Sequence, residues 1–189
     1  ASFLGENKID FLVDATHPFA VRISRHAAKA CEDKNVVYFS LVRPPWKRSP
    51  ADEWISVADM AAAANAVPSR ARAFLTIGCK DVAAFLPRTD VTWLARSIEP
   101  LGMHTPENWS HFEARPPFSL EHELAFLEDN RVEILVCKNS GGVTETKLEA
   151  ARNLKLPVIM VDRPTTEQPP LAETAAEMAD LLRQRFATV

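Results

Sequence analysis

The chain has 189 residues, of which 47% are apolar and 25% are charged, and its formal charge is −3. This composition is typical of a globular protein and excludes a disordered chain. The length is enough to bury roughly 70% of the unfolded surface in one or two small domains. No apolar run approaches the roughly 18 residues of a membrane span, and residues 1–8 lack a signal-peptide pattern. We therefore expect a cytoplasmic protein that does not bind a membrane.

The charged and metal-binding residue types exclude two further classes of site. The chain has 22 basic and 25 acidic residues, which is not the basic excess of a nucleic-acid binder. The histidines have no zinc-like spacing, so no metal is expected. The cysteines are odd in number and far apart, and each lies in or beside an apolar segment. We expect them to be free thiols rather than disulfides; they are Cys31, Cys79 and Cys137.

Short apolar runs alternate with amphipathic segments along the whole chain. Strands are predicted at 9–13, 36–43, 54–57, 73–78, 91–98, 132–137 and 157–161. Helices are predicted after Pro18, over 60–67 with Ser56 or Asp59 as the cap, over 81–86, and from Ser119, Thr144 and Thr174. The proline-rich stretch 99–118 is expected to be a long loop.

This alternation predicts an α/β fold with parallel sheets. The only good domain boundary is the turn at 68–70. We therefore expect an N-terminal α/β domain over 1–68 and a C-terminal α/β domain over 69–189.

Ligands of open α/β sheets bind outside the carboxyl ends of the strands, so polar turns at those ends are candidate sites. Asp14, Thr16 and His17 follow the first predicted strand at the start of a helix, where free amides and the helix dipole favour an anion. Capping of the helix would also explain Asp14 and Thr16. An imidazole is not needed in a cap, so His17 favours a functional interpretation.

The second candidate turn is Lys138-Asn139-Ser140-Gly141-Gly142, with Thr144 and Lys147 after it. Two adjacent glycines in a chain with only 5 indicate positive φ or a close approach by another group. Amides at a helix start beside an ammonium suit a phosphate or carboxylate. A tight connection with a solvated lysine is the alternative. Neither a P-loop nor a G-x-G-x-x-G spacing is present.

Further cationic groups follow other predicted strands, and together they would favour a polyanion at one edge of the sheet. Each alone is typical of an ordinary surface turn. They are Arg43, with Trp46 close to it in Arg-Pro-Pro-Trp, and then Arg96 and Arg163.

The ordered set of these motifs resembles the precorrin-6A reductases of cobalamin biosynthesis. The resemblance runs from about residue 9 to 164 and rests on Asp-Ala-Thr-His-Pro-Phe-Ala at 14–20, Arg-Pro-Pro-Trp at 43–46, Thr-Ile-Gly at 76–78, Lys-Asn-Ser-Gly-Gly at 138–142, Thr144, Lys147-Leu148 and 161–164. It implies two Rossmann-like domains with the active site in the cleft between them. It also implies NADPH-dependent reduction of one double bond in precorrin-6A to give precorrin-6B, or reduction of the cobalt-containing analogue.

The resemblance implies the following roles. We expect NADPH, with NADH as the alternative, to supply hydride, and a polycarboxylate tetrapyrrole to be the partner of a monomer or small homo-oligomer. The expected catalytic residues are Asp14, Thr16 and His17, with His17 as the proton donor and water as the alternative donor. The expected substrate ligands are Arg43, Trp46, Arg96 and Arg163. The expected cofactor ligands are Lys138, Asn139, Ser140, Gly141, Gly142, Thr144 and Lys147, with a substrate carboxylate as the alternative ligand of 139–144.

Family members begin with a strand and a Gly-Gly-Thr-type turn ahead of the Asp-Ala-Thr-His motif. Here that motif begins at residue 14, so we expect the first domain to lack its opening β-α-β unit. Two other functions compete with the reductase: a non-catalytic α/β module that binds a nucleotide or tetrapyrrole, and a dehydrogenase of unrelated small substrates.

Overall fold

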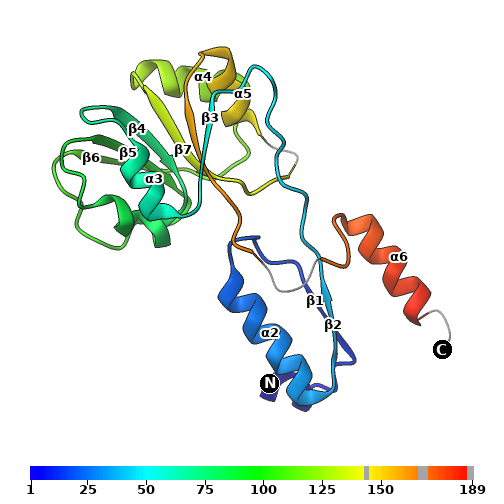
Figure 1. Cartoon of the computed structure of the whole chain (residues 1–189). Helices are drawn as coiled ribbons and strands as arrows, with labels where there is room; N and C mark the ends of the chain where they lie inside the picture. Colours follow the sequence, from blue (N-terminus) through cyan, green and yellow to red (C-terminus); the bar gives the residue numbers. More distant parts are fainter. Residues whose placement is uncertain (143–144, 166–169, 187–189) are drawn as a thin grey trace. The chain divides into compact units, whose positions relative to one another are not determined.

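A computed structural model describes residues 1–142, 145–165 and 170–186 of the chain, and its elements are labelled in Figure 1. The chain divides into two compact units. Unit 1 comprises Ala1–Pro45, Ser140–Gly142 and Pro164–Val189, and unit 2 comprises Trp46–Asn139 and Val143–Arg163. No helix among the described residues is long and apolar enough to cross a membrane.

Unit 2 is built on a six-stranded sheet in which every pairing is parallel. In spatial order its strands are β3 (Trp54–Val57), β8 (Val158–Val161), β7 (Ile134–Lys138), β4 (Arg72–Thr76), β5 (Thr92–Ser97) and β6 (Trp109–Glu113). Its helices are α3 (Met60–Ala66), the 3₁₀ helix η1 (Cys79–Phe85), α4 (Leu120–Asp129) and α5 (Thr146–Asn153). The predicted α/β fold with parallel strands is confirmed.

The strand order of this sheet contains a topological switch point. From β4 the chain runs outward through β5 to β6, and it then returns to β7 and runs the other way to β8. The direction reverses between β4 and β7, which are paired from Ala73↔Ile134 to Thr76↔Cys137. In open α/β sheets the ligand crevice lies outside the carboxyl ends of the strands at such a point.

Burial on both faces explains why the inner strands are continuous apolar runs. All four residues of β8 are buried, as are four of the five in β7. Two helices of unit 2 begin at the predicted caps. The Asp59 carboxylate accepts from the Ala62 amide at 2.8 Å, and the Ser119 hydroxyl accepts from the His122 amide at 3.2 Å.

Unit 1 contains a parallel pair of strands, β1 (Phe11–Asp14) and β2 (Val37–Ser40), with helices packed on it. The helices are α1 (Ser2–Glu6), α2 (Val21–Lys34) and α6 (Ala175–Phe186). Side chains alternate along each strand. Phe11 stacks on Phe186 of α6 at 4.7 Å between ring centroids, whereas Asp14 faces Ser24 of α2. The two helices therefore cover opposite faces of the pair (Figure 1).

The division into units differs from the boundary expected at residue 68. β3 and α3 precede that boundary, but β3 pairs with β8 from Trp54↔Val158 to Val57↔Val161 and so lies in the sheet of unit 2. Conversely, Met178 of the C-terminal helix packs with Phe39 in the core of unit 1. Partners distant in sequence, rather than the turn at 68–70, decide which unit each segment joins.

The prediction of a loop over the whole of 99–118 is wrong, because Trp109–Glu113 forms β6 at the edge of the large sheet. An edge strand has a neighbour on one side only, so it does not need the continuous apolar run that marks an inner strand. The strand predicted over 36–43 is also shorter, since β2 ends at Ser40.

Candidate functional site

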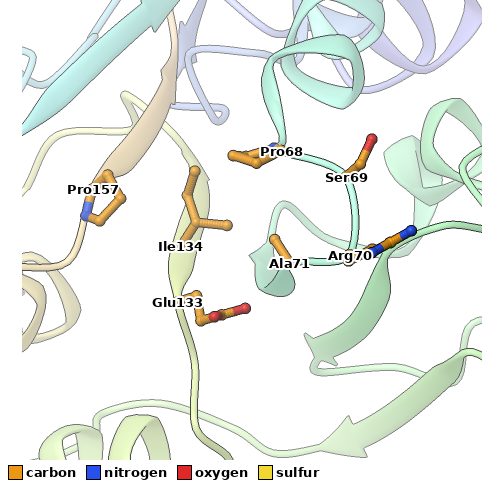
Figure 2. A pocket seen from close by; sticks show the side chains of 7 residues that line it. All are labelled: Pro68, Ser69, Arg70, Ala71, Glu133, Ile134 and Pro157. Carbon is orange, nitrogen blue, oxygen red and sulfur yellow. The ribbon is translucent and has the colours of Figure 1, made fainter.

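A surface hollow of about 330 Å³ lies at the amino-terminal edge of the large sheet (Figure 2). Its lining comes from residues at or just before the starts of β4, β7 and β8: Pro68, Ser69, Arg70, Ala71, Glu133, Ile134 and Pro157. Ligands of parallel sheets bind at the opposite, carboxyl ends. The turns after the strands are therefore the candidate site.

The turn after β1 is held together by the buried carboxylate of Asp14. This carboxylate accepts from the Thr16 amide at 3.0 Å and from the Tyr38 hydroxyl at 2.7 Å. Burial alone would raise the pKa of Asp14, but hydrogen bonds from Ser24, Tyr38 and Thr16 outweigh it and hold the pKa below its usual value. Burial, followed by the bond to Asp14, raises the pKa of Tyr38. Asp14 is thus an ionised anchor of the turn.

The hydrogen bonds of His17 fix its tautomer. The Phe19 amide donates to Nδ1 at 3.2 Å, so Nδ1 carries a lone pair. In the neutral ring the proton then lies on Nε2, which is 3.0 Å from the Ser140 hydroxyl oxygen and donates to it. His17 therefore acts as a donor that orients Ser140.

The segment Ser140–Gly142 meets Arg43 as well as His17 within unit 1. The Arg43 Nε donates to the Ser140 carbonyl at 2.8 Å. Gly141 and Gly142 have φ of 65° and 105°, and a Cβ on Gly142 would lie 3.3 Å from Arg43 Cδ. Both reasons predicted for the paired glycines, positive φ and close approach, are confirmed. The two candidate polar turns are in direct contact.

Asn139 makes a second set of contacts, all of them with residues of unit 2. Its Oδ1 accepts from the Trp46 amide at 2.8 Å, and its Nδ2 donates to the Trp46 carbonyl at 3.3 Å. The Arg163 Nε donates to the Asn139 carbonyl at 2.8 Å. The Trp46 side chain lies in the core of unit 2 and is only 9% exposed. These residues hold together the segments at the carboxyl ends of the strands. Because the Trp46 ring is buried, it offers little surface to a ligand.

Polar groups also meet at the switch point. Lys138, the last residue of β7, forms an ion pair with Asp81 of η1. The neighbouring Thr76 hydroxyl, at the end of β4, donates to the Val136 carbonyl at 3.4 Å. The predicted cofactor ligand Lys138 thus has an acidic partner inside the protein. Thr144, another predicted ligand, lies outside the described residues.

Arg96 is buried at the carboxyl half of β5 instead of facing solvent as a carboxylate clamp. Its Nη2 donates to Glu123 of α4 at 2.6 Å, and its guanidinium lies 4.0 Å from the centroid of Phe118. Glu123 was not anticipated from the sequence. A signal was present, because Glu123 falls on the apolar stripe that Leu120, Leu124 and Leu127 define at helical spacing.

The start of α2 fits a cofactor phosphate. Its N-cap residue, Ala20, provides no side-chain hydrogen bond, and its first turn has no acidic residue. Helix amides without a side-chain cap attract anions. Arg22 and Arg25 add positive charge within the first five residues. The donor set of this helix start therefore suits a dinucleotide phosphate, although the usual glycine fingerprint is absent from the sequence.

Unit 2 defines the class of protein: a parallel α/β sheet with a Rossmann-type switch point, to which the chain adds polar turns suited to an anionic ligand. The sequence matches the family "Precorrin-6x reductase CbiJ/CobK" over residues 1–183. The chain belongs to this family of oxidoreductases, which confirms the resemblance seen in the motifs.

Individual relatives agree with the family match. The chain is 41% identical over 173 residues to the precorrin-6A reductase of Rhodococcus erythropolis, covering 90% of this chain and 69% of that protein. It is 41% identical over 165 residues to the precorrin-6A reductase of Mycobacterium tuberculosis, covering 86% and 66%. A solved structure, "CobK precorrin-6A reductase", matches with a TM-score of 0.87 at 33% identity, covering 98% of this chain and 77% of that one. The chain spans about two thirds of the length of these curated relatives.

Proposed function

We propose that the protein containing this chain reduces one double bond of precorrin-6A to give precorrin-6B, with NADPH as the reductant, in cobalamin biosynthesis. The observation that carries the proposal is the contact between His17 and Ser140, at 3.0 Å. It joins the two turns whose motifs the family shares, 14–20 and 138–142. Matched relatives named precorrin-6A reductase are 34–41% identical to this chain, whereas those named cobalt-precorrin-6A reductase are 28–31% identical, and this difference supports the metal-free substrate.

The nicotinamide cofactor, when bound, supplies the hydride, and the protein orients it and supplies charge. The start of α2 is the proposed phosphate site, with Arg22 and Arg25 beside it. The phosphate proposed to bind there is the 2′-phosphate, which NADPH has and NADH lacks. Guanidinium groups favour this phosphate over a ribose hydroxyl, which supports NADPH rather than NADH.

Ser140 is the proposed hydrogen-bond donor to a substrate carboxylate. His17 donates its Nε2 proton to the Ser140 oxygen, so the hydroxyl proton of Ser140 points away from the imidazole. Arg43 holds the carbonyl of the same residue. In this arrangement His17 is a positioning residue for Ser140, whereas Asp14 and Thr16 hold the turn that carries His17.

The test is NADPH oxidation that depends on added precorrin-6A, measured with the chain and any flanking sequence that its gene encodes. We expect Ser140→Ala and His17→Ala each to raise KM at least tenfold. His17→Gln, whose side-chain amide can still donate to Ser140, should stay within about tenfold of wild type in kcat/KM. Arg22→Gln tests the phosphate site through the preference for NADPH over NADH, which it should lower. Arg183→Gln on α6 is the matched control and should leave this preference unchanged.

Three outcomes would contradict parts of this proposal. Thermal stabilisation by precorrin-6A without NADPH oxidation would indicate a non-catalytic binding module. If His17→Gln lowers turnover and its pH–rate profile lacks one limb, His17 acts as the general acid of the reaction. If Arg22→Gln keeps the wild-type preference for NADPH, the proposed phosphate site at α2 is contradicted.

A further inference from the structure

Lys147 occupies a fixed position just beyond the carboxyl end of the large sheet. It lies in the first turn of α5, the helix that follows β7, and its Nζ is 4.5 Å from the centroid of the Trp46 ring. Trp46 is itself fixed, because its backbone amide and carbonyl both bond to the Asn139 side chain. The ammonium therefore rests on an immobile aromatic face at the edge where ligands bind.

Four other titratable or charged groups face this ammonium, and none of them forms an ion pair with it among the described residues. Glu123 of α4 is already paired with Arg96 of β5. Burial raises the pKa of the Cys137 thiol on β7 to about 11, so this group is uncharged at neutral pH. Glu145, before α5, is the fourth. Within the described part of the chain, no carboxylate forms an ion pair with Lys147.

These surroundings make Lys147 a better proton donor than an ordinary lysine. Burial lowers the pKa of its amine, and the charge of Arg96 lowers it further, whereas Glu123 and Glu145, and Cys137 once it is ionised, act in the opposite direction. The position in the first turn of a helix also disfavours a cation. An amine whose pKa moves toward neutrality can release and regain a proton during turnover.

We propose that Lys147 is the proton donor of the reduction, an inference that rests on the proposed function. As hydride forms the new C–H bond at one carbon of the substrate double bond, the π-electron pair moves to the neighbouring carbon. That carbon takes a proton from Nζ, one N–H bond of Lys147 breaks, and a neutral amine remains. Water then returns the proton to the amine. In the neutral ring the Nε2 proton of His17 is donated to the Ser140 hydroxyl oxygen, so the proton donation is assigned to Lys147.

Three variants test the proposal with precorrin-6A and NADPH. Lys147→Gln removes the amine. Lys147→Arg keeps the charge and the contact with Trp46 but cannot release a proton. Lys155→Gln is the control, since Lys155 is an exposed lysine just after the same helix. We expect both Lys147 variants to lower kcat about 100-fold or more with KM changed less than about threefold, and the control to match wild type.

Amine rescue separates a proton donor from a structural lysine. Small alkylamines should restore turnover to Lys147→Ala, faster for amines whose pKa lies closer to the assay pH, and should not accelerate wild type. As a readout without substrate, acetic anhydride labelling across a pH series should show Lys147 titrating below the usual range of a lysine.

Each contrary result has a distinct meaning. Wild type that does not oxidise NADPH with precorrin-6A overturns the proposed function and this role with it. Active wild type, with Lys147→Arg within tenfold of it, identifies an anion-binding lysine and overturns the proton-donor role alone. Absence of amine rescue, or a labelling curve of Lys147 in the usual range of a lysine, also overturns the proton-donor role.

Discussion

Replacing Glu123 with leucine should destabilise unit 2 strongly, because it leaves the charge of Arg96 buried without its partner. The two side chains are 6% and 2% exposed, and the bond between them is 2.6 Å. Breaking a buried ion pair by removing one partner costs about 3–5 kcal/mol. At about 2–4 °C per kcal/mol for a chain of this size, the melting temperature should fall by about 6–20 °C.

The pair itself should add little net stability. Among the residues that the structure describes, Arg96 Nη1 and Glu123 Oε2 have no hydrogen-bond partner, so the cost of burying both charged groups is incompletely recovered. Apolar replacements of both partners are often neutral or stabilising in such cases. We therefore expect the double variant Arg96→Met/Glu123→Leu to recover most of the loss caused by Glu123→Leu, although it forfeits the cation–π contact with Phe118.

Urea unfolding followed by tryptophan fluorescence measures this effect directly, since all four tryptophans lie in unit 2. The matched control is Glu99→Leu in the same unit, which breaks an exposed pair with Arg115 and should cost less than about 1 kcal/mol. The reasoning is refuted if Glu123→Leu costs no more than Glu99→Leu. It is also refuted if the double variant is as unstable as the sum of the single ones.

Two further predictions concern unit 1. Gly142→Ala places a Cβ 3.3 Å from Arg43 at a residue with positive φ, so it should raise the KM for precorrin-6A. Gly102→Ala is the control, because Gly102 also has positive φ but its Cβ would meet open space. Equal KM values for the two variants would contradict the role of the close approach. The lowered pKa of Asp14 means that its carboxylate stabilises the fold above about pH 4 and loses this effect as the pH falls through the folded-state pKa. Wild type should therefore lose stability over that window more steeply than Asp14→Asn, as monitored by near-ultraviolet circular dichroism of Tyr38, the only tyrosine; parallel curves for the two proteins would contradict it.

The elements that the sequence predicts best are those whose signal is local. Inner strands such as β7 and β8 are buried on both faces, so each shows an uninterrupted apolar run. The caps at Asp59 and Ser119 follow from side-chain chemistry within three residues. Strand partners are not local, and nothing in Trp54–Val57 distinguishes pairing with β8 from pairing with β2.

The same distinction applies to the candidate site. The paired glycines predicted their own backbone conformation, because adjacent glycines in a glycine-poor chain are a local signal. Arg96 at a strand end was expected to bind substrate, yet its partner Glu123 is 27 residues away and is brought to it only by the packing of α4. Tyr38 was missed because a single tyrosine in a strand gives no sign that its hydroxyl will reach Asp14.

Consecutive residues of the 138–142 turn have separable roles, and this separation makes the proposed functions independently testable. The side chain of Asn139 bonds to Trp46, on which Lys147 rests, and these contacts lie within unit 2. Ser140 bonds to His17 and Arg43, and these contacts lie within unit 1. A change at Ser140 removes a binding hydroxyl without touching the support of Lys147. Substitutions should therefore impair substrate affinity and proton delivery separately, because Asn139 and Ser140, although adjacent, contact different residues.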